Sequence, residues 1–482
     1  MAACNEDFCS EYAELKPEEA SFLDCLRILF SPELGGTDCV DTNSVPGAGH
    51  LSFRSRWLIF ISVVAQKILI YLKDPLAWLG SALEIFLNYP SFNGGIFWLV
   101  LNFLTGKMVR PETTSENFRS FIANMDVRVD LDRKIKNGDS RYAPLLSIMA
   151  AKLSYENEAF VERVVTNNWK LKEYSIHPIV LTDYADDKST QAIMFQDKAE
   201  DPNLVVVAFR GTEPFNADDW RTDLDLSWYK LEGVGKLHAG FMRALGLQQN
   251  KGWPKEIERG PGKKQFAYYE IREKLREILR TNENAKFVVT GHSLGGALAI
   301  LFAAVLIIQE EEELLGKMEG VYTFGQPRVG DVEFGDYMVE KLKKYRVKYF
   351  RYVYANDMVP RLPYDDKTYF FKHFGSCIYY NSLYNAQVLE EEPNKNYFSL
   401  LWVMPKMMNA GFELMRGFML PWINGGDYRE GWVLTLGRMA GLLIPGISDH
   451  GPEDYVNLTR LGTPPESLQF PETVPQQGLK RD

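Results

Sequence analysis

The stretch KFVVTGHSLGGALAILFAA, residues 286–304, decides the fold. Its first part, Phe287–Thr290, is rich in β-branched residues, whereas Gly295–Ala304 is rich in small and helix-forming residues. This change predicts a strand, a tight turn and a helix, with Ser293 at the turn. The turn matches the pattern G-x-S-x-G, in which the glycines permit a strained backbone and the serine hydroxyl stands above a sheet. Ser293 is therefore a candidate nucleophile; the alternative is a glycine-rich turn that happens to contain a serine.

From about residue 140 onwards, predicted strands and helices alternate. We expect helices at 144–156 and 267–280, and strands within 204–211, 285–291, 320–330 and 347–360. This alternation is typical of an α/β protein with a mostly parallel central sheet. Such sheets bind ligands at the carboxyl ends of their strands, and Ser293 follows one of these strands directly.

A serine nucleophile requires an imidazole as base and a carboxylate that fixes the imidazole's tautomer. In proteins with this turn, the acid and then the histidine follow the serine in the chain. Only His373 and His450 follow the turn; His450 lies in a loop of Gly, Pro and Asp, whereas His373 is flanked by aromatic residues. Asp357 comes at the end of the strand YFRYVYAND, and Asp331 is its rival one strand earlier. We select Asp357 and His450.

Donors are also needed for the negative charge that develops on the substrate oxygen. The backbone N–H of Leu294, directly after the serine, is one candidate. The loop in VVVAFRGTEP supplies the other, because Thr212 offers both an N–H and a hydroxyl. His292 points the wrong way along the turn to act as the base, and we interpret it as a packing or hydrogen-bonding residue.

Composition limits the class of protein. The 482 residues are 46% hydrophobic and 24% charged, as in an ordinary globular protein, and the net charge of −10 disfavours nucleic-acid binding. The acidic runs 310–313 and 390–392 are interpreted as solvated. Four of the five cysteines lie in residues 1–50, which mix acids, Pro and Gly and are expected to be poorly ordered. No zinc-type spacing is present, and an odd cysteine count without a secretory signal favours a reducing compartment.

Two regions are unusually apolar. Between residues 51 and 110, the runs 57–72, 76–89 and 96–106 are separated by turn signals and flanked by basic residues. Each run is shorter than the ~20 residues that cross a bilayer, which favours a re-entrant hairpin or interfacial helices; the alternative is a buried helical subdomain. The second region, 396–445, is rich in Met, Leu, Phe and Trp. It is interpreted either as a lipid-contacting or lid-like insertion or as helical core.

With these residues in place, the chain resembles the class 3 lipases, a family typified by secreted fungal triacylglycerol lipases. The matching stretches, in the family's order, are VVVAFRGTE (205–213), LHAGF (237–241), VVTGHSLGGALA (288–299), YTFGQPRVGD (322–331), YVYANDMVPRLP (352–363) and SDHGPEDY (448–455). The resemblance implies an α/β-hydrolase fold with a Ser293, Asp357 and His450 triad and an oxyanion hole from Thr212 and Leu294. It aligns 213–226 with the family's mobile lid, which would open at a lipid surface.

The chain departs from the fungal pattern in its apolar 51–110 region, in its 396–445 insertion and in lacking the secreted members' cysteine framework. These departures resemble the plant oil-body lipases, whose members lie on lipid droplets. Composition and the resemblance together predict three parts: a poorly ordered segment 1–50, a membrane- or droplet-associating region 51–110 and a lipase domain 111–482.

The expected function is that of a membrane-associated serine hydrolase that releases fatty acids from triacylglycerols at a lipid-droplet surface facing the cytosol. No metal, cofactor or nucleic acid is expected, and self-association into a homo-oligomer stays open. A phospholipase A1 or galactolipase would use the same triad. A non-catalytic lipase-like scaffold is the third interpretation.

Overall fold

The computed structural model describes residues 9–31, 37–42, 52–136, 138–171, 179–181, 190–197, 204–247, 253–258, 266–363, 371–395, 397 and 399–463. Its central sheet has the strand order β12-β11-β10-β9-β8-β5-β4-β3. The five inner strands β5, β8, β9, β10 and β11 run parallel, and β3, β4 and β12 pair antiparallel at the edges. The strands are β3 (Ile179–Leu181), β4 (Thr190–Asp197), β5 (Leu204–Phe209), β8 (Lys286–His292), β9 (Met318–Phe324), β10 (Lys348–Tyr354), β11 (Ser376–Tyr380) and β12 (Ala386–Leu389).

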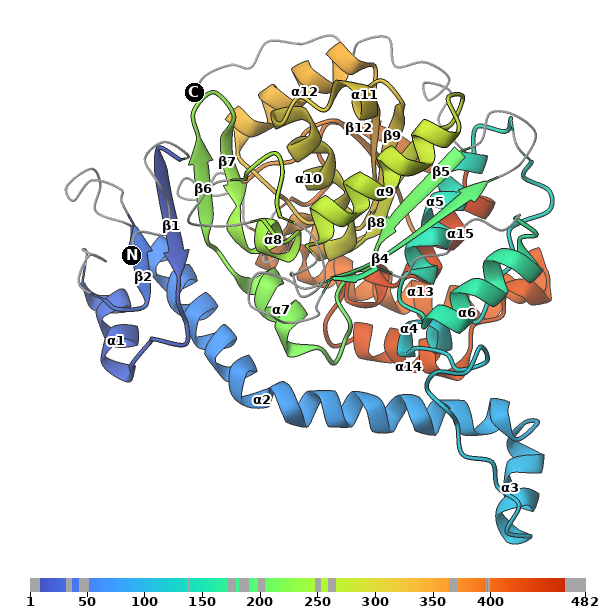
Figure 1. Cartoon of the computed structure of the whole chain (residues 1–482). Helices are drawn as coiled ribbons and strands as arrows, with labels where there is room; N and C mark the ends of the chain where they lie inside the picture. The colour runs from blue at the N-terminus through green and yellow to red at the C-terminus, as the bar shows by residue number, and fades with distance from the viewer. Residues whose placement is uncertain are drawn as a thin grey trace.

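Helices cover both faces of this sheet (Figure 1). Helices α8 to α12 contribute to one half of the core, and α5, α6 and α15 contribute to the other. The expected mostly parallel sheet and α/β-hydrolase fold are confirmed. The helices are α4 (Phe121–Met125), α5 (Tyr142–Leu153), α6 (Glu158–Arg163), α8 (Ala239–Ala244), α9 (Ala267–Thr281), α10 (Leu294–Ile308), α11 (Glu312–Leu315), α12 (Val332–Tyr345) and α15 (Pro452–Leu461).

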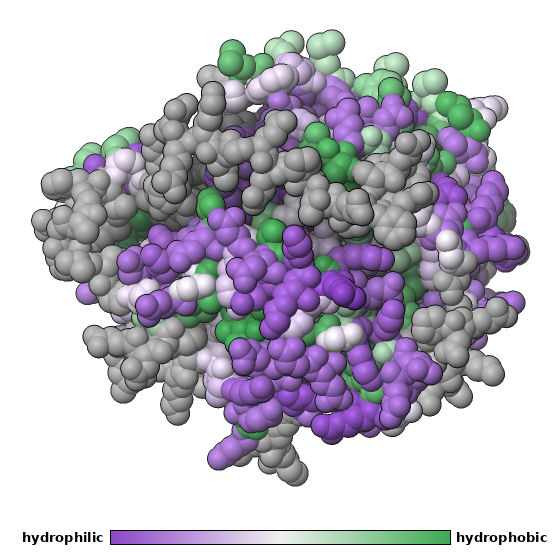
Figure 2. Space-filling view, turned by 90° about the horizontal axis from the view of Figure 1, so that it is seen from above, coloured by the Kyte–Doolittle hydropathy of each residue, from purple (hydrophilic) through white to green (hydrophobic). Residues whose placement is uncertain are grey.

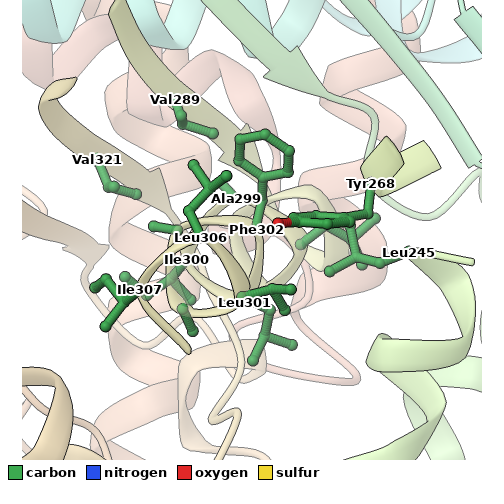
Figure 3. Packing of buried hydrophobic residues seen from close by; sticks show 14 of the residues in the cluster. Leu245, Tyr268, Val289, Ala299, Ile300, Leu301, Phe302, Leu306, Ile307 and Val321 are labelled. Carbon is green, nitrogen blue, oxygen red and sulfur yellow. The ribbon is translucent and has the colours of Figure 1, made fainter. Parts of the chain in front are cut away.

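The strand β8 is buried on both faces, which explains its uninterrupted apolar sequence. Successive side chains of a strand point to opposite faces, so Val289 joins the α10 half of the core and Val288 joins the α5 half. In Figure 3, Phe302 of α10 lies between Val289 and Tyr268 of α9. The rings of Phe302 and Tyr268 are 5.5 Å apart between centroids. This packing fixes α10, and with it the turn at Ser293.

The N-terminal residues take part in a second, antiparallel sheet with the order β2-β1-β6-β7. The expectation that residues 1–50 are poorly ordered is wrong for the described residues 9–31 and 37–42. There β1 pairs with β6, and the buried side chains of Cys25 and Cys39 pack in a small apolar core that includes Trp228. Residues 1–8, 32–36 and 43–51 lie outside the described residues. The elements are β1 (Glu11–Leu15), α1 (Phe22–Phe30), β2 (Val40–Thr42), β6 (Trp228–Leu231) and β7 (Gly235–His238).

The first two apolar runs of the 51–110 region form one helix, α2 (Phe53–Phe92), and the third forms α3 (Ile96–Leu104). The expectation of separate short runs is therefore wrong, because Pro75 lies inside α2 without ending it. A proline inside a helix removes a hydrogen bond and bends the axis, and α2 is bent in Figure 1. By length and composition, α2 is the one helix among the described residues that could cross a bilayer.

The 396–445 insertion forms α13 (Val403–Asn424) and α14 (Trp432–Gly441). Each helix has one buried face, and large apolar side chains are exposed on the other. The insertion is therefore a surface layer, and its interpretation as helical core is wrong. Residues 396 and 398 lie outside the described residues.

The two acidic runs are not simply solvated. Glu311 is buried and pairs with Arg272 and Arg276 of α9. Glu392 is buried and lies 3.2 Å from a guanidinium nitrogen of Arg328. A run of like charges cannot reveal which member has a basic partner far away in the chain.

Candidate active site

The backbone at Ser293 has the strained geometry that the G-x-S-x-G pattern predicts. Ser293 has φ 59° and ψ −131°, a combination that residues with a side chain rarely adopt. A Cβ atom on Gly291 would lie 2.1 Å from the carbonyl oxygen of Gly295, and one on Gly295 would lie 2.2 Å from that of Phe209. Both glycines are thus required for β8, β5 and α10 to approach closely enough to form the turn.

Ser293, His450 and Asp357 form one continuous chain of hydrogen bonds. The Oγ atom of Ser293 lies 2.7 Å from Nε2 of His450, and Nδ1 of His450 lies 2.9 and 3.0 Å from the two carboxylate oxygens of Asp357. Ser293 follows β8, Asp357 follows β10, and His450 ends the short 3-10 helix Ser448–His450 after α14. The structure therefore brings together the three side chains that the sequence selected.

The carboxylate of Asp357 is fully buried and is held by further donors. The backbone N–H of Val359 donates to Oδ1 at 2.9 Å, and the hydroxyl of Tyr455 donates to Oδ2 at 2.5 Å. Burial, together with the negative charge of Asp357, raises the pKa of Tyr455, so its hydroxyl keeps the proton that it donates. Sequence reasoning did not single out Tyr455, although it ends the quoted stretch SDHGPEDY.

His292 supports the backbone of His450. Its Nε2 lies 2.8 Å from the carbonyl oxygen of His450, and because a carbonyl only accepts, Nε2 must donate. Its Nδ1 then accepts a hydrogen bond from the hydroxyl of Tyr155, and these two atoms lie 3.2 Å apart. Burial and the neighbouring His450 lower the pKa of His292 well below its ordinary value, which keeps the ring neutral. This geometry agrees with the interpretation of His292 as a hydrogen-bonding residue.

The two rival residues have structural partners elsewhere. Nε2 of His373 lies 2.7 Å from the carbonyl oxygen of Pro360. The carboxylate of Asp331 caps α12 by accepting the N–H of Phe334 at 2.9 Å, and it also accepts the N–H of Lys236. Neither residue joins the chain of hydrogen bonds at Ser293.

The two expected oxyanion donors flank Ser293. Leu294 is the first residue of α10, and the first amides of a helix have no acceptor within the helix. Thr212 follows Gly211, where an added Cβ would lie 3.1 Å from Cβ of Ser293, so this loop touches the nucleophile. The Thr212 hydroxyl is engaged, since it donates to Asp223 at 2.6 Å. The backbone N–H of Thr212 is therefore the candidate donor to the oxyanion.

The expected lid, residues 213–226, contains the helix α7 (Ala217–Leu224). Arg210 directly follows β5 and pairs with Glu213 at 2.6 Å and with Asp219 at 3.4 Å. These two ion pairs hold the start of the expected lid against the end of a sheet strand. Further along α7, Asp223 is half-buried. Burial raises its pKa to about 7, although the Thr212 hydroxyl and the charge of His450 act in the opposite direction. Ser293 is only 6% exposed, so this arrangement is closed.

Helix α7 packs on the apolar helix α2 (Figure 1). The hydroxyl of Ser62 donates to the carbonyl oxygen of Leu224 at 2.6 Å, and Lys73 pairs with Asp218 at 2.7 Å. At Gly80 a Cβ atom would lie 2.5 Å from Cβ of Phe215, so glycine is needed for this close approach. The candidate lid and the expected lipid-associating helix are thus in direct contact.

Comparison with known proteins agrees with this geometry. The family model "Lipase (class 3)" matches residues 206–367, which include Thr212, Ser293 and Asp357. A protein of Arabidopsis thaliana named "Triacylglycerol lipase OBL1" is 44% identical over 86% of this chain and 86% of its own length. Proteins of the same name from Nicotiana tabacum and Ricinus communis are 41% and 36% identical, over 84% and 93% of this chain and 83% and 94% of their own lengths. The chain therefore belongs to the class 3 lipase family.

Proposed function

We propose that this protein is a triacylglycerol lipase in which Ser293 is the nucleophile. The observation that carries the proposal is the continuous chain of hydrogen bonds from Ser293 through His450 to Asp357, at a turn whose glycines allow no side chain. The choice of triacylglycerol as substrate is supported by the relatives named "Triacylglycerol lipase OBL1", which this chain matches along most of their length.

Acylation follows from the distances. His450 takes the proton of the Ser293 hydroxyl at Nε2 while Oγ attacks the ester carbonyl carbon, and Asp357 stabilises the resulting imidazolium. The N–H groups of Leu294 and Thr212 hold the oxyanion of the tetrahedral intermediate. When the ester C–O bond breaks, His450 returns the proton to the departing diacylglycerol alkoxide.

Deacylation repeats these steps with water. His450 takes a proton from water, the hydroxide attacks the acyl-serine carbonyl, and the proton returns to Oγ of Ser293 as the fatty acid leaves. Tyr455 and the amide of Val359 hold the carboxylate of Asp357 in place throughout. His292 keeps the backbone of His450 in place.

The working location in this proposal is the cytosolic surface of a lipid droplet. Support comes from α2 and α3, which expose large apolar side chains, including Trp78, Phe97 and Trp98. Such side chains favour a lipid–water boundary over water. In this division residues 51–110 associate with lipid, and 111–482 form the hydrolase.

The test is fatty-acid release from an emulsified long-chain triacylglycerol by the full chain and by Ser293→Ala, with phosphatidylcholine vesicles in parallel. We expect release from the emulsion that falls by about 10³-fold or more in the variant, as when a nucleophilic serine is removed elsewhere. Release from vesicles only would replace the substrate by a phospholipid. Equal release by both proteins would exclude Ser293 as the nucleophile, and no release by folded protein would favour the scaffold.

A further inference from the structure

Helix α13 has its polarity reversed relative to an ordinary surface helix. Its three charged residues, Lys406, Glu413 and Arg416, all lie on the inward face and are 5%, 0% and 6% exposed. Its outward face carries large apolar side chains, among them Phe418 and Trp422, and the latter is 91% exposed. A helix that borders water places its apolar stripe inward and its charges outward. Here the opposite arrangement exists.

The inward charges have partners in the hydrolase core. Glu413 accepts a hydrogen bond from the hydroxyl of Tyr354 at 2.9 Å, and Arg416 pairs with Asp454 of α15 at 2.8 Å. Lys406 donates to the carbonyl oxygen of Tyr397. Because breaking a buried ion pair leaves a desolvated charge behind, α13 cannot turn over to hide its apolar face. The face is therefore held outward by the fold.

Helix α14 shows the same reversal. Its single charged residue, Arg438, is buried and pairs with Glu430 at 2.7 Å and with Asp454 at 3.0 Å. Asp454 thus anchors both helices, since it also binds α13. The outward side chains of α14 are apolar. We call the exposed apolar residues of both helices and of the following turn the α13–α14 surface: Val403, Met404, Met407, Met408, Phe412, Met415, Phe418, Met419, Trp422, Ile423, Trp432, Leu436, Met439, Leu443, Ile444 and Ile447.

The α13–α14 surface lies at the same end of the molecule as α2 and α3. The short helix α4 packs against both α2 and α14, and the helices α2, α3, α4 and α14 all lie in the lower half of Figure 1. None of the residues of α3 is buried, and none is charged. Figure 2 shows the molecule from above, the side away from α2 and α3, where hydrophilic residues predominate among those described. The described residues on that side are therefore mainly hydrophilic, whereas α3, at the other end, is uncharged and unburied.

The α13–α14 surface also adjoins the element that carries the triad histidine. The 3-10 helix Ser448–His450 packs against α14, and a Cβ atom on Gly441 would lie 2.6 Å from Oγ of Ser448. A lipid phase that contacts α14 would therefore lie next to the 3-10 helix that carries His450.

We propose that the α13–α14 surface is a second lipid-docking element, which inserts its apolar side chains into the surface of a lipid phase. The inference rests on the proposed function, because it names where the enzyme meets the phase that holds its substrate. Two features favour lipid over a second copy of the chain. Unbranched Met side chains and protruding Trp side chains suit a fluid apolar surface and its boundary with water. The surface also lies at the same end as the exposed apolar α3, so one flat lipid surface can contact both.

The experiment measures flotation of the full chain with triolein droplets coated with phosphatidylcholine. The variant is Phe418→Glu with Trp422→Glu, which changes only exposed side chains of α13. The matched control is Val339→Glu on α12, which adds a charge at a 48%-exposed position on the opposite side of the molecule. Hydrolysis of a water-soluble short-chain ester, abolished by Ser293→Ala, reports that each variant is folded.

We expect the double variant to bind droplets at least about tenfold more weakly, because burying each large apolar side chain contributes to binding and each added carboxylate opposes it. Its activity on the soluble ester and the binding of the control variant should not change. Unchanged droplet binding by the double variant would overturn the inference, as would a wild-type dimer in sedimentation that the variant dissociates without loss of droplet binding.

The outcomes separate this inference from the proposed function. If the wild-type protein binds droplets through Phe418 and Trp422 but releases no fatty acid, docking stands and the function fails. If the double variant releases fatty acid from droplets as the wild type does, the function stands and docking fails. A double variant without activity on the soluble ester would be replaced by Leu436→Glu on α14, for which the same results are expected.

Discussion

The half-buried carboxyl of Asp223 makes the closed lid dependent on pH. Burial raises its pKa from 3.8 to about 7. A change of one pKa unit corresponds to 1.36 kcal/mol, so the charged form of Asp223 lowers the free energy of unfolding of the closed structure by about 4 kcal/mol. This value is an upper limit, because water entry around α7 would lower the cost of the charge.

The sign follows from proton binding. Between about pH 4 and about pH 7 the closed protein binds more protons at Asp223 than the unfolded chain does, so its free energy of unfolding falls as the pH rises through this window. The penalty is absent below the unfolded pKa and complete above the folded one. Asp223→Asn removes the charge and keeps an oxygen that can accept from Thr212. We therefore expect the variant to be more stable than the wild type at high pH and equally stable at low pH.

The assay is urea unfolding of the wild type and of Asp223→Asn at several values between about pH 4.5 and about pH 8.5. Asp336→Asn, which removes the charge of an exposed carboxylate on α12, is the matched control. A difference for Asp223→Asn that stays constant with pH, or that favours the wild type at high pH, would refute the reasoning.

Three further predictions concern single contacts. Gly295→Ala places a Cβ atom 2.2 Å from the carbonyl oxygen of Phe209, so we expect a loss of about 3 kcal/mol or more in urea unfolding and no measurable lipase activity. Tyr455→Phe removes the hydroxyl that donates to Asp357; kcat should fall about tenfold with little change in KM, measured on a soluble ester. Arg438→Met leaves the buried carboxylates of Glu413 and Asp454, and the partly buried one of Glu430, with one cation fewer. The free energy of unfolding should fall by about 3–5 kcal/mol in the same urea assay, and a rise would contradict this prediction.

Much of the site could be predicted because its signals are local. The glycines around Ser293 are adjacent in the chain, and their close contacts follow from the turn itself. Asp357 was found from its place at the end of a strand, and His450 from a short list of histidines. Each of these inferences needed only the order of the elements.

The remaining features depend on contacts between distant parts of the chain. Tyr455 reaches Asp357 because α15 packs beneath β10, and Glu311 is buried because α9 supplies two arginines. The strand β1 forms because β6, more than two hundred residues later, offers its edge. The continuity of α2 through Pro75 likewise follows from its packing on α7, which no local signal indicates.

The central claim is that Ser293 is the activated nucleophile, and covalent labelling tests it most directly. The full chain would be treated with a fluorophosphonate, which phosphonylates activated serines with loss of fluoride, and the modified peptide would be identified by mass spectrometry. We expect a single adduct on Ser293 that is absent in Ser293→Ala and greatly reduced in His450→Ala. An adduct on another serine, or equal labelling of Ser293 without His450, would contradict it.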